Sequence, residues 1–196
     1  MEVYLALGSN VGDREANLRE AVAQIRSLLE VNRESSIYET EPVGFADQRW
    51  FLNQVILARI PAIQARNHDA TVDEFKSSAE RAATAVLSKL HNIENEMGRE
   101  RTIKNGPRTI DIDLLLFGDA IIGYSREKKA QPLKEAKIWV PHRRMHERRF
   151  VLEPLCELAP EVVHPVLNKT CTELLSTLRD DSIVRLYAKT NKFVQG

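Results

Sequence analysis

The sequence predicts an α+β fold within the α/β class: an antiparallel sheet with helices packed mainly on one face, in the split β-α-β order of ferredoxin-like folds. Three observations predict it. Segments follow the order strand, helix, strand, strand, helix, strand, then short helices. Each long helical segment has a single apolar stripe, and the strands are short and bounded by glycine, proline or polar turns. The 196 residues suit one domain spanning 1–196.

The composition excludes several classes of protein. Lysine and arginine together (28) balance aspartate and glutamate (28), so no overall field attracts nucleic acid or acidic lipid. No apolar run is long enough to span a membrane, and no signal-peptide pattern opens the chain. The two cysteines lie outside C-x-x-C spacing, which indicates a reducing compartment. We expect a cytoplasmic protein without a nucleic-acid or membrane partner, and we take it to be a monomer.

The first elements are recognised from apolar patterning and capping. A buried strand is predicted over 3–7, and Asp13 then caps a helix over 14–30 whose apolar residues form one stripe. Two more strands are predicted over 34–38 and 51–58.

Two features of this half could contact a ligand. The Gly8-Ser9-Asn10 turn could let the backbone approach a ligand closely. The alternative is that this turn only joins a strand to a helix. Phe51 and Asn53 share one strand face. An aromatic ring beside an amide can stack on and hydrogen-bond a flat heterocycle. Equally, Phe51 could be core and Asn53 a strand-end residue.

The second half opens with a long amphipathic helix. Thr71 and Glu74 form a capping box, and apolar residues then recur every three or four positions until Gly98. Glu94 lies near the helix end, where an acidic side chain opposes the helix dipole. A nearby cation would make this placement less costly.

The remaining assignments depend mainly on composition. Surface insertions are predicted over 61–70 and 123–137, and short helices over 150–158 and 170–178. The polar tail from 179 carries no readable pattern.

The most informative stretch is a strand that carries two acids, within residues 106–118. Asp111 and Asp113 are predicted to share a face with Leu115 and Phe117. The opposite face is apolar: Ile110, Ile112, Leu114 and Leu116. Two carboxylates this close repel unless a cation lies between them, and their spacing suits Mg²⁺. The alternative is the solvated face of an edge strand.

A cluster of cations precedes the two acids: Arg99, Arg101, Lys104 and Arg108. Such a run is commonly a solvated surface. Beside two acids that suit a metal, however, it also matches a metal-bridged polyphosphate, which needs cations on one side and carboxylates on the other.

Parts of the sequence also suggest zinc binding, RNA binding or a metal-dependent nuclease. Pro141 suits a first helical turn, and His142 and His146 are spaced like helical zinc ligands, but no acid or cysteine completes a zinc set. A basic patch at 143–149 could bind RNA, yet the aromatic run of such modules is missing. A metal-dependent nuclease would use the two acids without needing Phe51 and Asn53.

Four stretches together carry a resemblance to a known family. They are Leu7-Gly8-Ser9-Asn10, Tyr38 to Gly44 with Phe51-Leu52-Asn53, Gly98 to Arg101 leading into Gly106 to Asp113, and Val140-Pro141-His142 with Arg148 and Phe150. Over roughly residues 3–165 the chain resembles the 6-hydroxymethyl-7,8-dihydropterin pyrophosphokinases, ATP-dependent enzymes of folate biosynthesis. The chain departs from many members at Asn105, where they have tryptophan.

The resemblance implies an enzyme, a Mg²⁺-dependent diphosphotransferase. It would transfer the β,γ-diphosphoryl group of ATP to the hydroxymethyl oxygen of 6-hydroxymethyl-7,8-dihydropterin and release AMP. The implied roles are Asp111 and Asp113 as ligands of two Mg²⁺ ions, Arg99 and Arg108 as catalytic arginines on the transferring phosphates, Glu94, Arg101, Leu114, His142 and Arg148 as ATP contacts, and Thr40, Val43, Phe51, Asn53 and Phe150 as pterin contacts.

Overall fold

The computed structural model describes residues 1–60, 72–99, 106–125 and 131–189, and its centre is an antiparallel sheet. The sheet contains β1 (Glu2–Ser9), β2 (Glu30–Glu34), β3 (Ile37–Thr40), β4 (Phe51–Arg59), β5 (Asp111–Phe117) and β8 (Val184–Ala188). The strand order is β5-β1-β4-β3-β8, and β2 also pairs with β4. A separate hairpin joins β6 (Val163–His164) to β7 (Lys169–Thr170).

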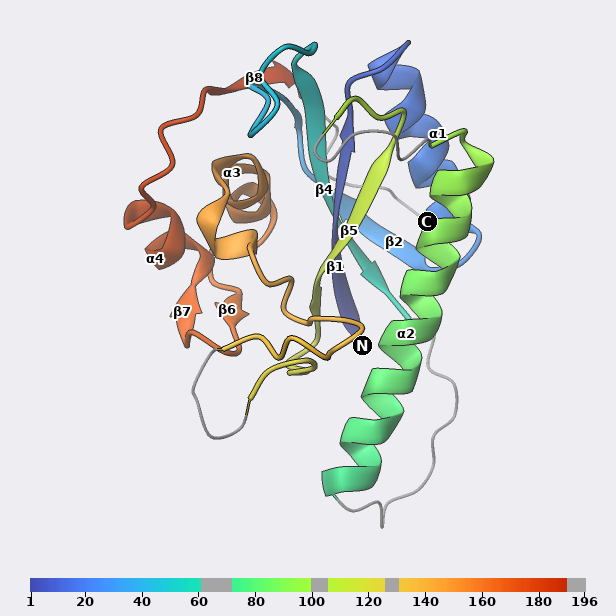
Figure 1. The fold of residues 1–196 in the computed structure, drawn as a ribbon, viewed down its shortest axis with the longest axis vertical. Helices are drawn as coiled ribbons and strands as arrows, with labels where there is room; N and C mark the ends of the chain where they lie inside the picture. Colours follow the sequence, from blue (N-terminus) through green and yellow to red (C-terminus); the bar gives the residue numbers. More distant parts are fainter. Residues whose placement is uncertain (61–71, 100–105, 126–130, 190–196) are drawn as a thin grey trace.

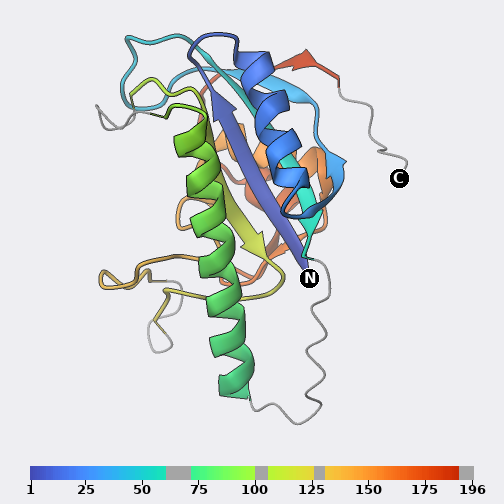
Figure 2. The same cartoon turned by 90° about the vertical axis from the view of Figure 1, so that its right-hand side faces the viewer.

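Helices cover both faces of this sheet (Figures 1 and 2). The long helices α1 (Arg14–Arg26) and α2 (Val72–Glu96) lie on one face, and the shorter α3 (Arg149–Leu158) and α4 (Cys171–Ser176) lie on the other. The first core includes Leu5, Leu18, Ile56 and Leu90, and the second includes Val55, Leu115, Leu152 and Leu155. The predicted ferredoxin-like α+β fold is confirmed, and α3 and α4 add a smaller layer to it.

The segment between α1 and β4 differs from its prediction. Helix α1 has the predicted Asp13 cap but ends at Arg26, because the chain turns and pairs with β4 from Glu30 onward. Residues predicted as one strand over 34–38 belong to two strands, β2 and β3, separated at Ser35 and Ser36. The Ser35 hydroxyl accepts a hydrogen bond from the backbone N–H of Val55 at 2.9 Å. This N–H of β4 therefore has a partner at the point where β2 ends and β3 has not yet begun.

A bulge in β5 corrects the predicted faces of its second half. Tyr4 of β1 pairs with Leu116 but Leu5 pairs with Leu114, which leaves Leu115 as an extra residue. Alternation therefore holds from Ile110 to Leu114 and shifts after it. Leu115 and Leu116 both join the core under α3. Phe117 joins the core under α1 and α2, opposite to the prediction.

The end of α2 has the predicted geometry. Gly98 has a φ of +75°, a conformation that favours glycine, and the Arg99 N–H donates to the Glu94 carbonyl at 3.0 Å. This reversal places Arg99 beside Glu94, where a cation makes the position of this acid near the helix end less costly. The capping box at Thr71 and Glu74 lies outside the residues whose side chains the structure describes.

Two C-terminal predictions need correction. Pro141 does not open a helix; it lies in a turn before η1, a short 3-10 helix (Met145–Glu147), and α3 begins only at Arg149. The stretch after 179 is not patternless, because residues 184–188 form β8 and pair with β3. Its edge position and largely exposed side chains hid it, since an exposed edge strand needs no apolar alternation.

The predicted insertions are only partly visible. Residues 61–70 and 126–130 lie outside the described residues, while most of the described residues of 131–137 are exposed. Within the described part of the chain, no helix has the length and apolar character needed to cross a membrane.

One buried connection ties α3 to the junction of β2 and β3. The carboxylate of Glu157 accepts hydrogen bonds of 3.0 Å from the Ser36 N–H, the Ser36 hydroxyl and the Tyr38 hydroxyl. Burial, followed by the hydrogen bond to Glu157, raises the pKa of Tyr38, so its hydroxyl stays protonated and donates.

We predict that Glu157→Ala lowers the free energy of unfolding by about 1–3 kcal/mol, because it leaves these donors without their acceptor. Urea unfolding followed by circular dichroism measures the change. Glu161→Ala, at an exposed position, is the control. Equal midpoints for the two variants would show that the Glu157 network does not stabilise the fold.

Candidate active site

A cavity of about 240 Å³ opens where β1, β3, β4 and β5 meet the start of α3. Its lining is Ala6, Leu7, Gly8, Thr40, Glu41, Val43, Phe51, Asn53, Arg99, Arg108, Asp111, Asp113, His142, Arg144, Arg148 and Phe150. Four arginines and three acids lie among apolar and aromatic groups, so the cavity can hold a molecule that combines an anionic part with a flat apolar part.

Small residues of β1 form the floor of the cavity. Gly8 lies between Asn53 of β4 and Asp111 of β5, and Ala6 is paired with Asp113. A Cβ atom at Gly8 would stand 2.7 Å from Oδ1 of Asn53, closer than such contacts occur. The polar groups of β4 and β5 can therefore face the same space because β1 contributes almost no side chain between them.

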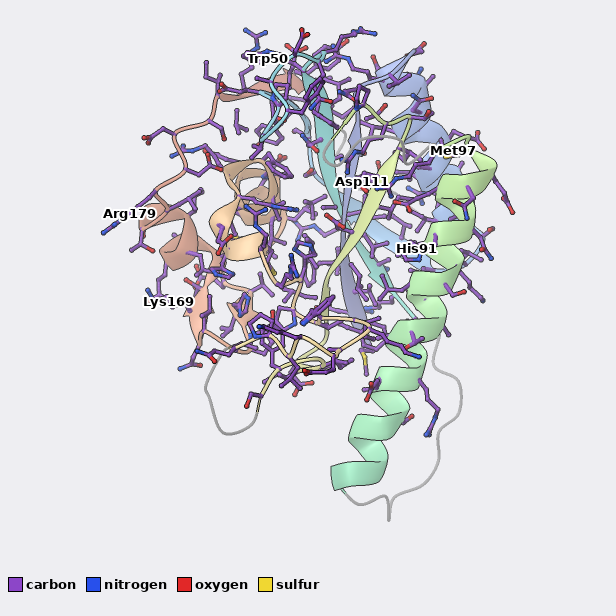
Figure 3. The ribbon with its side chains drawn as sticks, in the orientation of Figure 1. Trp50, His91, Met97, Asp111, Lys169 and Arg179 are labelled. Atoms are coloured by element: carbon purple, nitrogen blue, oxygen red, sulfur yellow. The ribbon has the colours of Figure 1, made fainter. Side chains whose placement is uncertain are left out.

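Asp111 is held by two arginines from different segments. Nη2 of Arg99 lies 2.6 Å from its Oδ1, and Nη1 of Arg108 lies 2.5 Å from its Oδ2. Arg99 also contacts the carboxylate of Glu94, which is 1% exposed. The same Glu94 carboxylate accepts the Ile112 N–H at 2.7 Å. The end of α2, β5 and both arginines are therefore joined by charge-assisted hydrogen bonds. Asp111 is labelled on β5 in Figure 3.

Asp113 has weaker partners than Asp111. Nη1 of Arg148 is 3.5 Å from its Oδ2, and Nε2 of His142 is 3.9 Å away. Burial lowers the pKa of His142 despite the neighbouring Asp113, so the ring is neutral near pH 7. The Asp113 carboxylate thus faces the cavity with room for a further cation.

The bulge in β5 positions His142. The carbonyl of the extra residue, Leu115, accepts the His142 N–H at 2.8 Å. This bond brings the turn before η1 against the strand that carries both acids, and His142 thereby reaches Asp113.

Aromatic and polar groups line the other part of the cavity, which we call the aromatic side: Thr40, Val43, Phe51, Asn53 and Phe150. Nδ2 of Asn53 donates to the Thr40 hydroxyl at 2.6 Å, which leaves the amide oxygen for another partner. The Arg148 guanidinium lies 5.5 Å from the centre of the Phe150 ring, so one cation borders both parts of the cavity.

The structure brings together most of the predicted site residues, with three exceptions. Glu94 does not line the cavity but holds Arg99 from behind. The Leu114 side chain is 3% exposed and belongs to the core. Arg101 lies outside the described residues, as does Asn105.

Sequence reasoning assigned no site role to four lining residues: Ala6, Leu7, Glu41 and Arg144. Gly8, from the turn considered for ligand approach, does line the cavity. Glu41 follows the predicted contact Thr40, which was a usable signal, whereas nothing local marks Ala6. Asn10, in the turn considered for ligand approach, instead connects loops. Its Oδ1 accepts the Arg108 N–H at 2.8 Å, and its Nδ2 donates to Gln48 Oε1 at 2.9 Å.

The geometry does not support the zinc and RNA-binding alternatives. His142 and His146 do not share a helix, and His146 packs on His164 with ring centres 5.7 Å apart. Across the described ranges, no cluster of three or more histidine, cysteine or acidic side chains could hold a metal ion by itself. The basic patch at 143–149 is dispersed, because Arg149 pairs with Glu153 while Arg144 and Arg148 face the cavity.

Comparison with known proteins agrees with this geometry. The sequence model of the 7,8-dihydro-6-hydroxymethylpterin-pyrophosphokinase (HPPK) family matches residues 4–160. The chain is 41% identical over 161 residues to the 2-amino-4-hydroxy-6-hydroxymethyldihydropteridine pyrophosphokinase of Bacillus subtilis. This alignment covers 81% of this chain and 78% of the Bacillus protein. The Aquifex aeolicus protein of the same name is 34% identical over 171 residues, covering 87% of this chain and 88% of the relative.

Solved structures share the fold. A crystal structure of Plasmodium falciparum HPPK-DHPS has a TM-score of 0.59 at 15% identity and covers 89% of this chain, which spans 45% of that longer chain. The chain therefore belongs to the HPPK family, the pyrophosphokinases that transfer a pyrophosphoryl group from ATP to hydroxymethyldihydropterin in folate biosynthesis.

Proposed function

We propose that this chain carries out the pyrophosphokinase reaction by binding magnesium-bridged ATP at Asp111 and Asp113 and the pterin on the aromatic side of the cavity. The observation that supports this assignment best is the position of Asp111. Its carboxylate lies between Arg99 and Arg108, in a cavity that also contains Phe51 and Phe150. Cations, acids and flat apolar surface are thereby combined within one site.

The donor set fits Mg²⁺. This ion keeps several waters and takes one or two carboxylates together with phosphate oxygens, so a cage of three protein ligands is not needed. Asp111 and Asp113 would hold two such ions, which would supply positive charge to neutralise the phosphates.

The arginines would change partners when nucleotide binds. Asp111 pairs with both Arg99 and Arg108 in the structure. Both guanidinium groups would turn from Asp111 to phosphate oxygens, which an arginine binds through paired hydrogen bonds. Glu94 continues to hold Arg99, so its guanidinium stays at the cavity wall.

Phe51 and Phe150 would stack on the two faces of the pterin, and Asn53 would hydrogen-bond its polar edge. The amide orientation set by Thr40 presents the Asn53 oxygen as an acceptor, which suits the N–H groups of a pterin. The substrate hydroxyl acts as the nucleophile, so positioning and charge neutralisation supply the catalysis. A cytoplasmic location and a monomeric state remain predictions from the sequence.

The first prediction concerns the products. With MgATP and 6-hydroxymethyl-7,8-dihydropterin the chain should form AMP and no ADP, because attack falls on the β-phosphorus. Separation of the nucleotides by anion-exchange chromatography measures both. The formation of ADP, or turnover that persists in EDTA, would reject the proposal.

The second prediction concerns the metal ligands. Asp113→Asn should lower kcat at least about a hundredfold, equivalent to roughly 2.7 kcal/mol, because it removes charge that binds the metal. Stopped assays of AMP measure the rate, and urea unfolding checks that the fold is retained. Asp119→Asn, at an exposed turn, is the matched control. If the two variants were equally active, Asp113 would not belong to the site.

The third prediction concerns the cavity floor. Gly8→Ala should raise the KM for pterin about tenfold, or roughly 1.4 kcal/mol, with a smaller effect on the KM for ATP. The new methyl group displaces the Asn53 amide and disturbs its hydrogen bond to Thr40. A double-mutant cycle with Asn53→Ala tests this cause, because the two changes should then be strongly non-additive. Additive effects would mean that Gly8 does not act through Asn53.

A further inference from the structure

The described C-terminal residues contact both flanks of the aromatic side of the cavity, although they lie beyond the family match at 4–160. The chain leaves α4, passes α3 and then forms β8 at the edge of the sheet beside β3 (Figure 1). None of the residues that line the cavity lies in this segment, which we call the C-terminal strap, residues 180–185.

The first end of the strap holds the start of α3. A carboxylate oxygen of Asp180 accepts the Arg149 N–H at 2.8 Å, and Nε of Arg149 donates to the Asp180 carbonyl at 2.8 Å. Arg148, the N-cap residue, makes no side-chain cap, so Asp180 supplies the acid that a helix start favours. Although burial opposes it, hydrogen bonds from Arg149 and Ser182 lower the pKa of Asp180. The helix turn that carries Phe150 is therefore held from outside α3.

The second end of the strap holds the segment that follows β3. The Glu41 N–H donates to the Ile183 carbonyl at 3.1 Å, and the Ile183 N–H donates to the Glu41 carboxylate at 2.8 Å. Thr40 pairs with Val184 in the sheet. Since Thr40 and Glu41 both line the cavity, the strap is bonded directly to its wall.

Arg185 extends this contact toward Phe51. Its guanidinium lies 2.7 Å from Oε2 of Glu39 and 4.7 Å from the centre of the Trp50 ring. Arg14 connects the same two residues, because it pairs with Glu39 at 2.9 Å and donates to the Trp50 carbonyl at 2.6 Å. Trp50 is labelled in Figure 3 at the end of the sheet where β8 lies. The residue preceding Phe51 is thus fixed by two arginines.

We propose that the C-terminal strap sets the separation between Phe150 and the wall formed by Thr40, Glu41 and Phe51, and that Asp180 and Arg185 are positioning residues for the pterin. This inference rests on the proposed pterin site. A flat ring bound between two aromatic side chains needs walls at a fixed spacing, and walls ordered before binding reduce the entropy lost when the ligand binds. Glu94 holds Arg99 without help from the strap, and only Arg148, the N-cap of α3, lies next to a strap contact. MgATP should therefore lose much less affinity than the pterin when the strap is altered.

The variants for the test are Asp180→Ala, Arg185→Ala and the combined change, all in the full chain. Two matched controls remove a charge without touching the strap's bonds to the cavity. Asp181→Ala lies next to Asp180 at an exposed position, and Arg59→Ala removes an exposed arginine paired with Glu2 at the other end of β4.

Equilibrium binding of 6-hydroxymethyl-7,8-dihydropterin, followed by its fluorescence, and of MgATP, followed by calorimetry, gives the decisive pair of measurements. The combined variant should bind pterin about five- to tenfold more weakly and MgATP within about twofold of wild type. Asp180→Asn and Arg185→Lys, which keep a hydrogen-bond acceptor and a positive charge respectively, should recover part of the pterin affinity. Both controls should bind like wild type.

Unchanged pterin affinity in the combined variant, or an equal loss of pterin and MgATP affinity, would overturn the inference. If the combined variant unfolds, the single variants provide the test. Each should lose more affinity for pterin than for MgATP. The formation of AMP by the wild-type chain tests the proposed function separately. If the wild-type chain forms AMP and the strap variants bind pterin as tightly as wild type, only the inference about the strap is rejected. If the wild-type chain binds no pterin, both the strap inference and the proposed function are rejected.

Discussion

The site depends on the Asp111 carboxylate being held between Arg99 and Arg108, with buried Glu94 behind Arg99. Glu94 also accepts the N–H of Ile112, so the same group connects the end of α2 to the strand that carries both acids. A buried carboxylate is costly without partners, and here its partners are a guanidinium and a backbone donor. The fold thereby keeps cations beside acids in a place that polyphosphate and metal ions would occupy together.

The sheet supplies the rigid frame for this arrangement. Gly8 in β1 leaves space between Asn53 and Asp111, which come from strands more than fifty positions apart in the chain. The extra residue in β5, Leu115, sends its carbonyl to His142 and brings a distant turn to the same edge. Strand pairing thus sets the positions of the polar groups, while loops contribute the arginines.

The two parts of the cavity are supported by different portions of the molecule. The charged part depends on α2 and β5, which lie within the family match at 4–160. The aromatic side has additional support from the C-terminal strap, which bonds to α3 through Arg149 and to the β3 wall through Glu41. The Arg99–Asp111 pair therefore has a support of its own, separate from the strap that holds the aromatic side.

Elements with a local signal could be predicted before the structure was known. Helix α2 could be recognised from its apolar stripe and the Gly98 stop, and the acids Asp111 and Asp113 from their spacing in a strand. Only the tertiary structure decided what depends on partners distant in the chain. The β5 bulge arises from pairing with β1, β8 is a strand only because β3 offers an open edge, and Glu94 supports Arg99 only because Gly98 reverses the chain. Local sequence encodes backbone preference and periodicity, whereas register, edge pairing and the choice of ion partners are set by packing between segments.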